Sequence, residues 1–202
     1  MKNKDWTGNT KSVFSTLGAN SHSEHDYEEH SFYATDPNSL RTFLDEYHTQ
    51  RKLSDKVWEC ACGNGVLSEV LKEYGYDVIS TDLINRGYGM GGVDFLLQTD
   101  KVNLDILTNP PYKQALEFVK HALEIQEEGC KTIMFLKLQF LEGQKRYDEL
   151  FKEQPPKEIY VHVKRQMCYM NGDMTNKMSS AVCYCWFVWE KGFTGNPIIK
   201  WI

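Results

Sequence analysis

Short apolar segments alternate with amphipathic segments of helical length along most of this chain, and this alternation restricts the fold more than any other feature. Apolar runs of strand length lie at 56–60, 77–81, 104–108 and 131–138. Apolar residues in the segments 36–47, 66–74 and 113–128 recur at helical spacing. Strands that alternate with helices of about 10 to 15 residues form β-α-β units. We therefore predict an α/β fold with a mostly parallel sheet and helices on both faces.

The C-terminal third of the chain departs from this alternation. A polar helix is predicted over 143–153, and two prolines at 155 and 156 end it. The apolar runs 158–163 and 180–190 follow with no helical pattern between them, and both look apolar on two faces. We therefore expect these two strands to form an antiparallel hairpin at one edge of the sheet.

Length and charge limit the domain organisation and the class of partner. A chain of 202 residues suits one domain, which we place at 30–202. Residues 1–29 lack apolar periodicity and end in the acidic run SEHDYEEH, so we predict a solvated, disordered tail there. The net charge of −5 has the wrong sign for a protein held to nucleic acid by its overall field, so any such contact needs a local patch.

Cysteine usage indicates a reduced compartment. The six cysteines include two C-x-C pairs and no C-x-x-C pair, a spacing that does not suit a tetrahedral zinc site. We predict buried structural thiols, no metal, and a cytoplasmic protein, because neither a signal peptide nor a long apolar span precedes them. The same absence of an apolar span predicts no membrane association.

A glycine turn follows the first strand, in the sequence WECACGNGVL. Gly63 and Gly65 allow a tight turn and close backbone approach to a ligand. Ser68 stands where a dinucleotide fingerprint has its third glycine, which weakens an NAD-dependent oxidoreductase as an alternative. The acidic residues Glu59 and Asp82 end neighbouring strands, where a carboxylate can accept hydrogen bonds from ribose hydroxyls, so the pattern suits a nucleoside without phosphates.

The segment TNPPYK, residues 108–113, ends the strand 104–108 and precedes a helix. Two prolines there have a purely structural explanation, since proline ends strands and suits the first helical turn. The amide of Asn109 and the ring of Tyr112 also permit a chemical role. Both the glycine turn and this segment lie at the carboxyl ends of strands, where ligands bind in open α/β sheets.

Five motifs taken together, FYATDP, ECACGNG, Asp82, GVDF and NPPY, resemble the S-adenosylmethionine-dependent N6-adenine DNA methyltransferases. The resemblance spans 31–189 and is most specific at NPPY with the preceding glycine turn. It implies a Rossmann-like methyltransferase fold, S-adenosylmethionine as the cofactor with S-adenosylhomocysteine as its product, and DNA as the substrate. It also implies a compact enzyme of the kind found in phages, acting in the cytoplasm of a bacterial or phage-infected host cell.

The resemblance also implies the cofactor contacts. The methionine part would meet residues near the N-terminus, the glycine turn would pass under the sulfonium, and acids with their neighbours would hold the ribose and adenine. These residues are Phe32, Tyr33, Thr35, Asp36, Glu59, Cys60, Ala61, Gly63, Gly65, Asp82, Leu83, Asp94, Phe95 and Asn109. For Asp94 and Phe95 the physical expectation agrees, since a carboxylate accepts from an exocyclic amine and a phenyl ring covers an aromatic face.

For the catalytic residues Asn109, Pro110, Pro111 and Tyr112, the resemblance and the chemistry agree. The Asn109 oxygen and the Pro110 carbonyl can each accept an N–H of the adenine amine, which directs its lone pair at the methyl group. The prolines restrict the backbone and carry no N–H, which keeps a carbonyl facing the pocket. Tyr112 can stack on the flat substrate ring.

Contacts to DNA are harder to predict. The segment 137–165 holds seven basic and five acidic residues, a balance of +2. Within it and the following loop, we take Arg146, Lys164, Arg165 and Lys177 as candidate phosphate contacts. A separate target-recognition domain does not fit after NPPY, so the recognition sequence stays open, and a protein partner or a dimer that supplies DNA affinity is one alternative. An RNA base or a protein glutamine amide as acceptor, and a catalytically silent S-adenosylmethionine-binding module, stay as alternatives.

Overall fold

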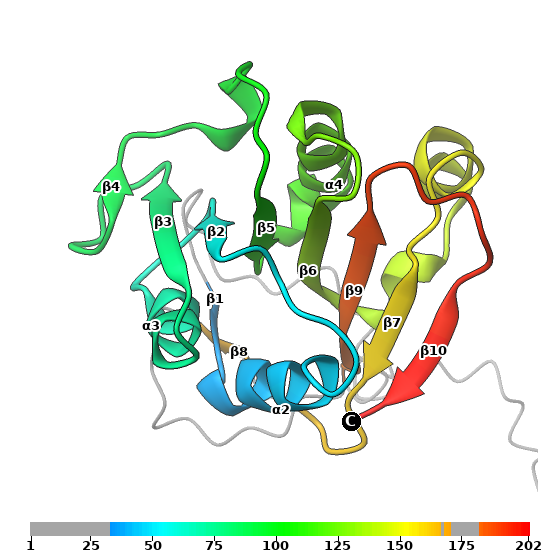
Figure 1. Ribbon diagram of the computed structural model, residues 1–202, viewed down its shortest axis with the longest axis horizontal. Coiled ribbons are helices and arrows are strands. Elements are labelled where there is room, and N and C mark those ends of the chain that lie inside the picture. Colours follow the sequence, from blue (N-terminus) through cyan, green and yellow to red (C-terminus); the bar gives the residue numbers. More distant parts are fainter. Residues whose placement is uncertain (1–32, 167, 171–181) are drawn as a thin grey trace, which may run out of the picture.

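The computed structural model describes residues 33–166, 168–170 and 182–202, so the predicted tail at 1–29 lies outside the described residues (Figure 1). The strands are β1 (Tyr33–Thr35), β2 (Lys56–Glu59), β3 (Asp77–Asp82), β4 (Met90–Gly91), β5 (Asp105–Thr108), β6 (Lys131–Lys137), β7 (Glu158–Val161), β8 (Cys168–Met170), β9 (Tyr184–Glu190) and β10 (Ile198–Trp201). The helices are α2 (Pro37–Tyr47), α3 (Val66–Glu73), α4 (Ala115–Ile125) and α5 (Gln144–Arg146), which a π-helical turn, Tyr147–Phe151, continues. Short 3₁₀ turns lie at Phe95–Leu97, Tyr112–Gln114 and Leu138–Leu141.

An eight-stranded sheet forms the centre of the molecule, in the order β10-β7-β9-β6-β5-β2-β3-β4. Strands β4, β3, β2, β5 and β6 run parallel to one another, and β9 is antiparallel to both β6 and β7. The predicted α/β class and the antiparallel pairing of the two late strands are therefore confirmed. The place of that pair differs, because β9 inserts between β6 and β7, and the unpredicted strand β10 forms the sheet edge beside β7.

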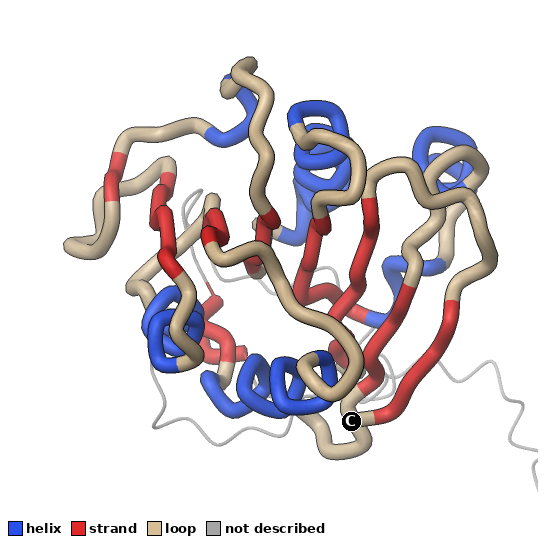
Figure 2. Tube along the Cα trace, in the orientation of Figure 1, coloured by secondary structure: helices blue, strands red, loops and turns tan. Residues whose placement is uncertain are grey.

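Helices cover both faces of the sheet, as the alternation of strands and helices predicts (Figure 2). Successive side chains of a strand point to opposite faces, and β6 shows the effect. Ile133 and Phe135 pack in the cluster that contains α2 and α3, whereas Met134 and Leu136 pack in the cluster that contains α4. The strand is apolar on both faces because both faces are covered.

The helix starts follow from local chemistry. Asp36 caps α2 by accepting a hydrogen bond from the Asn38 N–H at 2.9 Å, and Pro37 occupies the first turn. Gly65 precedes α3 with a φ of 85°, a left-handed conformation that glycine adopts without steric cost. Both starts agree with the sequence pattern.

The strands β1 and β8 form a separate antiparallel pair, with Thr35 opposite Cys168. Strands of three residues carry no readable periodicity, and this pair was not predicted. Its place matters because β1 leads into α2 and brings Thr35 to the end of β5, as described below.

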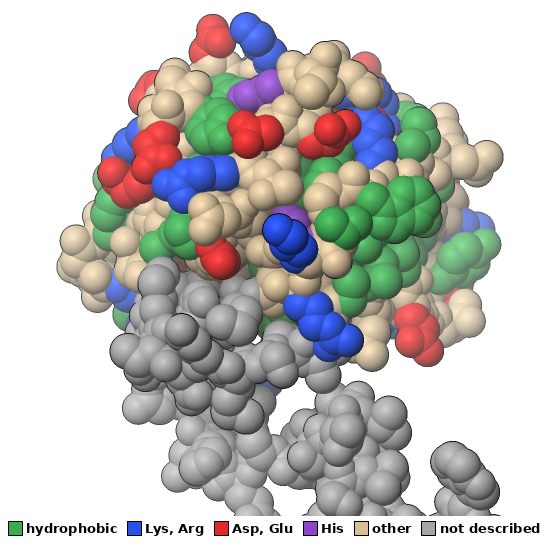
Figure 3. All heavy atoms as spheres, turned by 90° about the horizontal axis from the view of Figure 1, so that it is seen from below, with side chains coloured by type: hydrophobic (Ala, Val, Ile, Leu, Met, Phe, Trp, Pro, Cys, Tyr) green, Lys and Arg blue, Asp and Glu red, His purple; other side chains and the backbone are tan. Residues whose placement is uncertain are grey.

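Apolar side chains gather toward the β10 side of the face shown in Figure 3. The large apolar residues exposed on β10 and just after β7 are Val163, Ile198, Ile199 and Trp201. None of the helices in the described part of the chain has the length and apolar character of a membrane span.

Candidate active site

Three neighbouring strands bring the predicted motifs to one edge of the sheet. Strand β2 lies between β3 and β5, and all three are parallel. The glycine turn after β2, Asp82 at the end of β3 and Asn109 after β5 therefore share the carboxyl edge. This is the edge at which open α/β sheets bind ligands.

The glycine turn has a backbone that favours glycine. Gly63 and Gly65 have φ values of 56° and 85°. The N–H of Cys62 donates to the Thr81 carbonyl at 2.9 Å, and the N–H of Gly65 donates to the Cys62 carbonyl at 2.8 Å. One of these hydrogen bonds lies within the turn and the other holds the turn to β3. Because both glycines lack a side chain, the backbone of the turn can be approached closely by a ligand.

Tyr88 covers this turn from the side of α3. A Cβ atom added to Gly65 would lie 2.4 Å from Tyr88 Cγ, so the ring rests directly on the glycine. Tyr88 Oη donates to Glu69 at 2.5 Å and accepts from Lys72 Nζ at 2.8 Å. The tyrosine thus joins the loop after β3 to the helix that follows the glycine turn.

Glu59 at the end of β2 is 1% exposed. Ser68 Oγ donates to its Oε2 at 2.6 Å, and Thr108 Oγ1 lies 3.5 Å from its Oε1. Burial raises the pKa of Glu59 to about 7. The Glu59 carboxyl thus contacts α3 through Ser68 and the end of β5 through Thr108. Its contact with a cofactor stays a prediction.

Asp82 is held by the backbone of the site. Its two oxygens accept from the N–H groups of Gly63 and Ile84, each at 2.8 Å. The next residue, Leu83, is 52% exposed. An oriented carboxylate beside an exposed apolar side chain fits a nucleoside, whose ribose is polar and whose base is flat.

Asp94 and Phe95 follow in the loop after β4, and the structure changes the expectation for Phe95. Asp94 accepts from the Leu96 N–H at 3.0 Å and so caps a short 3₁₀ turn. The Phe95 ring is 2% exposed and lies in the core, 5.3 Å from the Trp58 ring and 5.0 Å from the Phe118 ring. A ring with both neighbours in the core does not present an open face to an adenine. Cys60 is likewise 1% exposed and packs in the core.

The segment Asn109–Tyr112 leaves β5 at the same edge. Asn109 is half-buried, and its Nδ2 donates to Thr35 Oγ1 at 2.9 Å. Because the amide nitrogen points at Thr35, the amide oxygen points away from it. Pro110 is buried, Pro111 is exposed, and Tyr112 begins the 3₁₀ turn before α4.

Two residues that the sequence did not single out complete this end of the site. Lys137 ends β6 and stands opposite Tyr184 of β9. The Lys137 Nζ lies 5.2 Å from the Tyr112 ring centroid, and the Tyr184 ring lies 5.9 Å from it. Only the strand order places Lys137 beside Tyr112, so the sequence pattern held no signal for it.

Of the remaining predicted cofactor residues, three lie within the described part of the chain and one does not. Phe32 lies outside the described residues, and Tyr33 is described through its backbone pairing with Met170. Asp36 caps α2, as noted above. Ala61 packs against the α4 cluster.

The candidate DNA contacts are only partly placed. Lys177 lies outside the described residues. Arg146 donates to the carbonyls of Gln139 and Glu142 and lies over the Phe140 ring, so its guanidinium ties down the turn before α5. Lys164 and Arg165 are exposed and follow β7, whose carboxyl end lies at the same sheet edge as the site.

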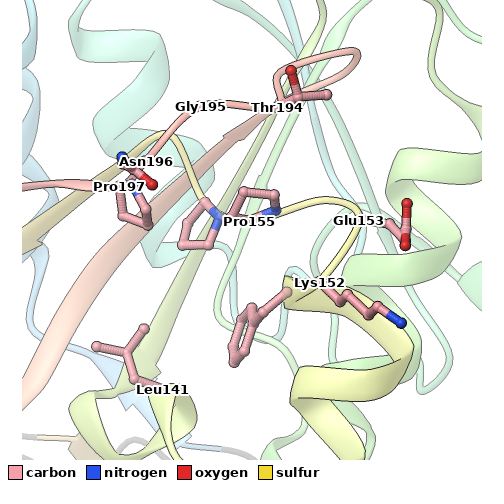
Figure 4. Close-up of a pocket in the computed structure, with 10 residues that line it drawn as sticks. Leu141, Lys152, Glu153, Pro155, Thr194, Gly195, Asn196 and Pro197 are labelled. Atoms are coloured by element: carbon pink, nitrogen blue, oxygen red, sulfur yellow. The ribbon is translucent and has the colours of Figure 1, made fainter.

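A cavity of about 510 Å³ lies elsewhere in the molecule (Figure 4). Its lining includes Pro155 and Pro156, just before β7, and Asn196 and Pro197, just before β10. It therefore lies at the amino ends of these strands, away from the motifs above. Among the described residues, no group of three or more histidine, cysteine or acidic side chains is placed to hold a metal ion.

Comparison with solved structures identifies the fold. No protein-family model and no curated protein matches the sequence. A Listeria monocytogenes protein, provisionally described as a class I S-adenosylmethionine-dependent methyltransferase, matches 82% of this chain with a TM-score of 0.55 and 13% identity. A predicted O-methyltransferase from Agrobacterium tumefaciens matches 75% of this chain and 81% of its own, with a TM-score of 0.54 and 10% identity.

The type IIG restriction endonuclease BpuSI also matches, over 82% of this chain, with a TM-score of 0.55 and 14% identity. This chain spans 64% of the Listeria protein and 26% of the endonuclease. At these identities the likeness shows the fold alone, which is that of the class I methyltransferases.

Proposed function

We propose that this chain is an S-adenosylmethionine-dependent methyltransferase that methylates the exocyclic N6 amine of adenine in DNA. The observation that carries the proposal is the placement of Asn109–Tyr112 beside the glycine turn, on adjacent strands of a methyltransferase fold. A cofactor site and an acceptor site on adjacent strand ends are what a direct transfer requires. One neighbour in fold, BpuSI, is by its name a restriction endonuclease, which is compatible with a DNA substrate.

The residues present fit the cofactor. The glycine turn offers a backbone surface without side chains, Asp82 is oriented by two N–H groups, and Leu83 is exposed beside it. We infer that 59–65 lie under the methionine part, that Asp82 holds the ribose, and that Leu83 and Asp94 meet the adenine. When bound, S-adenosylmethionine supplies an electrophilic methyl group.

The chain's own residues would then prepare the acceptor. The adenine amine is a weak nucleophile because its lone pair is delocalised into the ring. The Asn109 oxygen and the Pro110 carbonyl accept its two N–H groups, which localises the lone pair and aims it at the methyl carbon. A bound S-adenosylmethionine would supply the methyl group to this nitrogen, which would then release one proton to water. Tyr112 holds the ring by stacking.

The experiment uses labelled S-adenosylmethionine with separate pools of duplex DNA, single-stranded DNA, RNA and protein, followed by analysis of the methylated product. We expect N6-methyladenine in a DNA pool. Methyl transfer to a glutamine amide or to RNA alone would replace DNA as the substrate, and transfer to no pool would contradict the proposal.

The matched control is Asn109→Ala. We expect it to keep its affinity for S-adenosylmethionine and to lose about 100-fold or more in turnover, since orientation of the amine is lost. Unchanged turnover would remove Asn109 from the mechanism.

A further inference from the structure

Strand β6 contributes a cation, the ammonium of Lys137, to the end of the site that holds Asn109–Tyr112. Lys137 ends β6, which is the parallel neighbour of β5, and β5 leads into Asn109–Tyr112. The Lys137 ammonium lies 5.2 Å from the Tyr112 ring centroid, within the range of a cation–π contact. The lysine is half-buried, so its head is held near the ring rather than extended freely into water.

The charge of Lys137 has no acidic partner among the described residues. The other end of the same strand offers a comparison, because Lys131 lies 3.5 Å from the buried carboxylate of Asp105. Lys120 and Lys157 also pair with carboxylates, each at 2.7 Å. Lys157 also lies over a ring, that of Phe193, so what separates Lys137 from these lysines is that its ammonium faces a ring without a carboxylate partner among the described residues.

The chemistry of the proposed reaction limits what this cation can contact. Positive charge develops on the acceptor nitrogen as the methyl group arrives, and a second cation against that nitrogen would oppose the transfer. We therefore expect the Lys137 ammonium to contact a part of the acceptor away from that nitrogen. A cation is attracted most strongly to an anionic group there. A nucleotide carries such an anion in its phosphate, whereas a glutamine side chain does not.

We propose that Lys137 is a specificity-determining residue that binds a backbone phosphate of the nucleic acid whose base lies on Tyr112. The inference rests on the proposed function and extends it, since it explains why a nucleic acid is accepted in place of a protein amide. The phosphate contact fixes the strand, and the ring of Tyr112 receives the base.

The test compares Lys137→Met and Lys137→Arg with the wild type and with Lys56→Met. Methionine keeps the length of the lysine without its charge. Lys56 is an exposed lysine at the amino end of β2, the opposite sheet edge, and its loss removes one charge far from the site. Two quantities are measured over a range of salt concentrations. They are the KM and kcat for methylation of an adenine-containing duplex, and the Kd of the labelled duplex in the presence of S-adenosylhomocysteine.

We expect Lys137→Met to weaken duplex binding and to raise KM by about tenfold near 0.1 M salt. The negative slope of log affinity against log salt should become shallower by about 0.9, the value for one phosphate contact. We expect kcat and S-adenosylmethionine affinity to change little. Lys137→Arg keeps the charge and the slope, and Lys56→Met behaves as the wild type.

Three results would overturn the assignment while leaving the proposed function intact. The first is a Lys137→Met variant that matches Lys56→Met. The second is a lower kcat with unchanged KM and slope, which would make Lys137 a support for the Tyr112 ring. The third is a higher KM with an unchanged salt slope, which would indicate contact with an uncharged base. A wild type that methylates and binds no nucleic acid would instead defeat both proposals.

Discussion

The side-chain amide of Asn109 has a defined orientation because Thr35, 74 positions earlier in the chain, accepts a hydrogen bond from its nitrogen. Thr35 is 3% exposed, and its strand is held by pairing with β8. An amide whose nitrogen is engaged in this way presents its oxygen in one direction. The resemblance assigns Thr35 to the cofactor, and from this hydrogen bond we propose that Thr35 also positions Asn109.

Thr35→Val keeps the shape of the side chain and removes the hydroxyl. We expect kcat to fall about tenfold or more, because the Asn109 amide loses the bond that orients it, while KM and cofactor affinity change little. Thr35→Ser should restore most of kcat, since the hydroxyl returns. Weaker S-adenosylmethionine binding with normal kcat would instead favour the cofactor contact alone. Steady-state kinetics and calorimetry separate the two.

Tyr112 offers a ring and a hydroxyl, and the proposed stacking uses only the ring. Tyr112→Phe keeps the face that Lys137 approaches, so we expect activity within about threefold of the wild type. Tyr112→Ala removes a base contact of about 1–3 kcal/mol, so KM should rise by about 5- to 150-fold. Equal losses in the two variants would show that the hydroxyl matters.

Glu59 makes stability depend on pH. Burial raises its pKa from 4.5 to about 7, so between these values the unfolded carboxyl is ionised while the folded one keeps its proton. This contribution to the free energy of unfolding is fully present below about pH 4.5 and is lost as the pH rises to about 7, by about 3 kcal/mol. Glu59→Gln does not titrate and should lack this decline.

Urea unfolding of both proteins at pH 5 and pH 8 measures the difference. The quantity of interest is the change between the two pH values in wild type minus the same change in Glu59→Gln, because other groups titrate in both proteins. An identical pH dependence would mean that Glu59 is ionised in the fold throughout this range.

At the scale of elements, the loop after β3 and the helix α3 hold the glycine turn between them. Tyr88 rests on Gly65 and is bonded to Glu69 and Lys72 of α3. The turn therefore has a defined shape before any ligand binds. Such preorganisation reduces the entropy that binding must otherwise cost.

Gly65→Ala tests this packing. Alanine would have to adopt a φ of 85° and would clash with the Tyr88 ring, so we expect a loss of about 2–4 kcal/mol in the free energy of unfolding. Gly75→Ala is the matched control, because Gly75 has a φ of 88° and nothing within 4 Å of an added Cβ. It should lose only about 1–2 kcal/mol. Adding Tyr88→Ala to Gly65→Ala should relieve the clash, and denaturant unfolding of all four proteins decides whether it does.

The predictable elements were those with a long periodic pattern. The segments that became α2, α3 and α4 showed it, because burial of one helix face forces the spacing. Strands β2, β3, β5 and β6 were instead predictable as short apolar runs that alternate with these helices. Strands β1 and β8 have three residues each, too few for a period to register. Strand β10 is as long as β2 and β5, but no helical segment lies between it and β9, so the alternation of strands and helices held no signal for it. The insertion of β9 between β6 and β7 depends on pairing between distant segments, which local patterns do not encode.

The candidate site also contains features that the sequence predicted and features that it did not. Motifs at strand ends, such as Asn109 after β5, could be placed on one edge because parallel strands share their direction. The contacts between Thr35 and Asn109 and between Lys137 and Tyr112 depend on which strands are neighbours, and were missed. The burial of Phe95 was also missed, since a phenylalanine beside an aspartate reads equally as ligand contact or core.

At the scale of the whole molecule, the net charge of −5 does not exclude a nucleic-acid substrate, because the cations at the site edge act locally. Lys137 lies against Tyr112, and Lys164 and Arg165 follow β7 at the same edge. Many acids instead pair with lysines or arginines elsewhere, as Glu73 does with Arg41 and Glu158 does with Lys200. At physiological salt, exposed charges more than about 8 Å away are largely screened, so a phosphate close to this edge would interact with these cations more strongly than with distant acids.

Ligand binding should stabilise the whole fold, because the proposed cofactor site draws on β2, β3 and their loops at once. A ligand that binds only the folded state at 100 times its Kd adds about 2.7 kcal/mol to the free energy of unfolding. For a chain of this size that corresponds to a rise in Tm of about 5–10 °C. We expect S-adenosylhomocysteine to produce this rise and NAD to produce none, since the buried Ser68 replaces the third glycine that a dinucleotide site requires. Differential scanning calorimetry with each ligand measures both shifts, and a rise with NAD but not with S-adenosylhomocysteine would exclude the methyltransferase assignment.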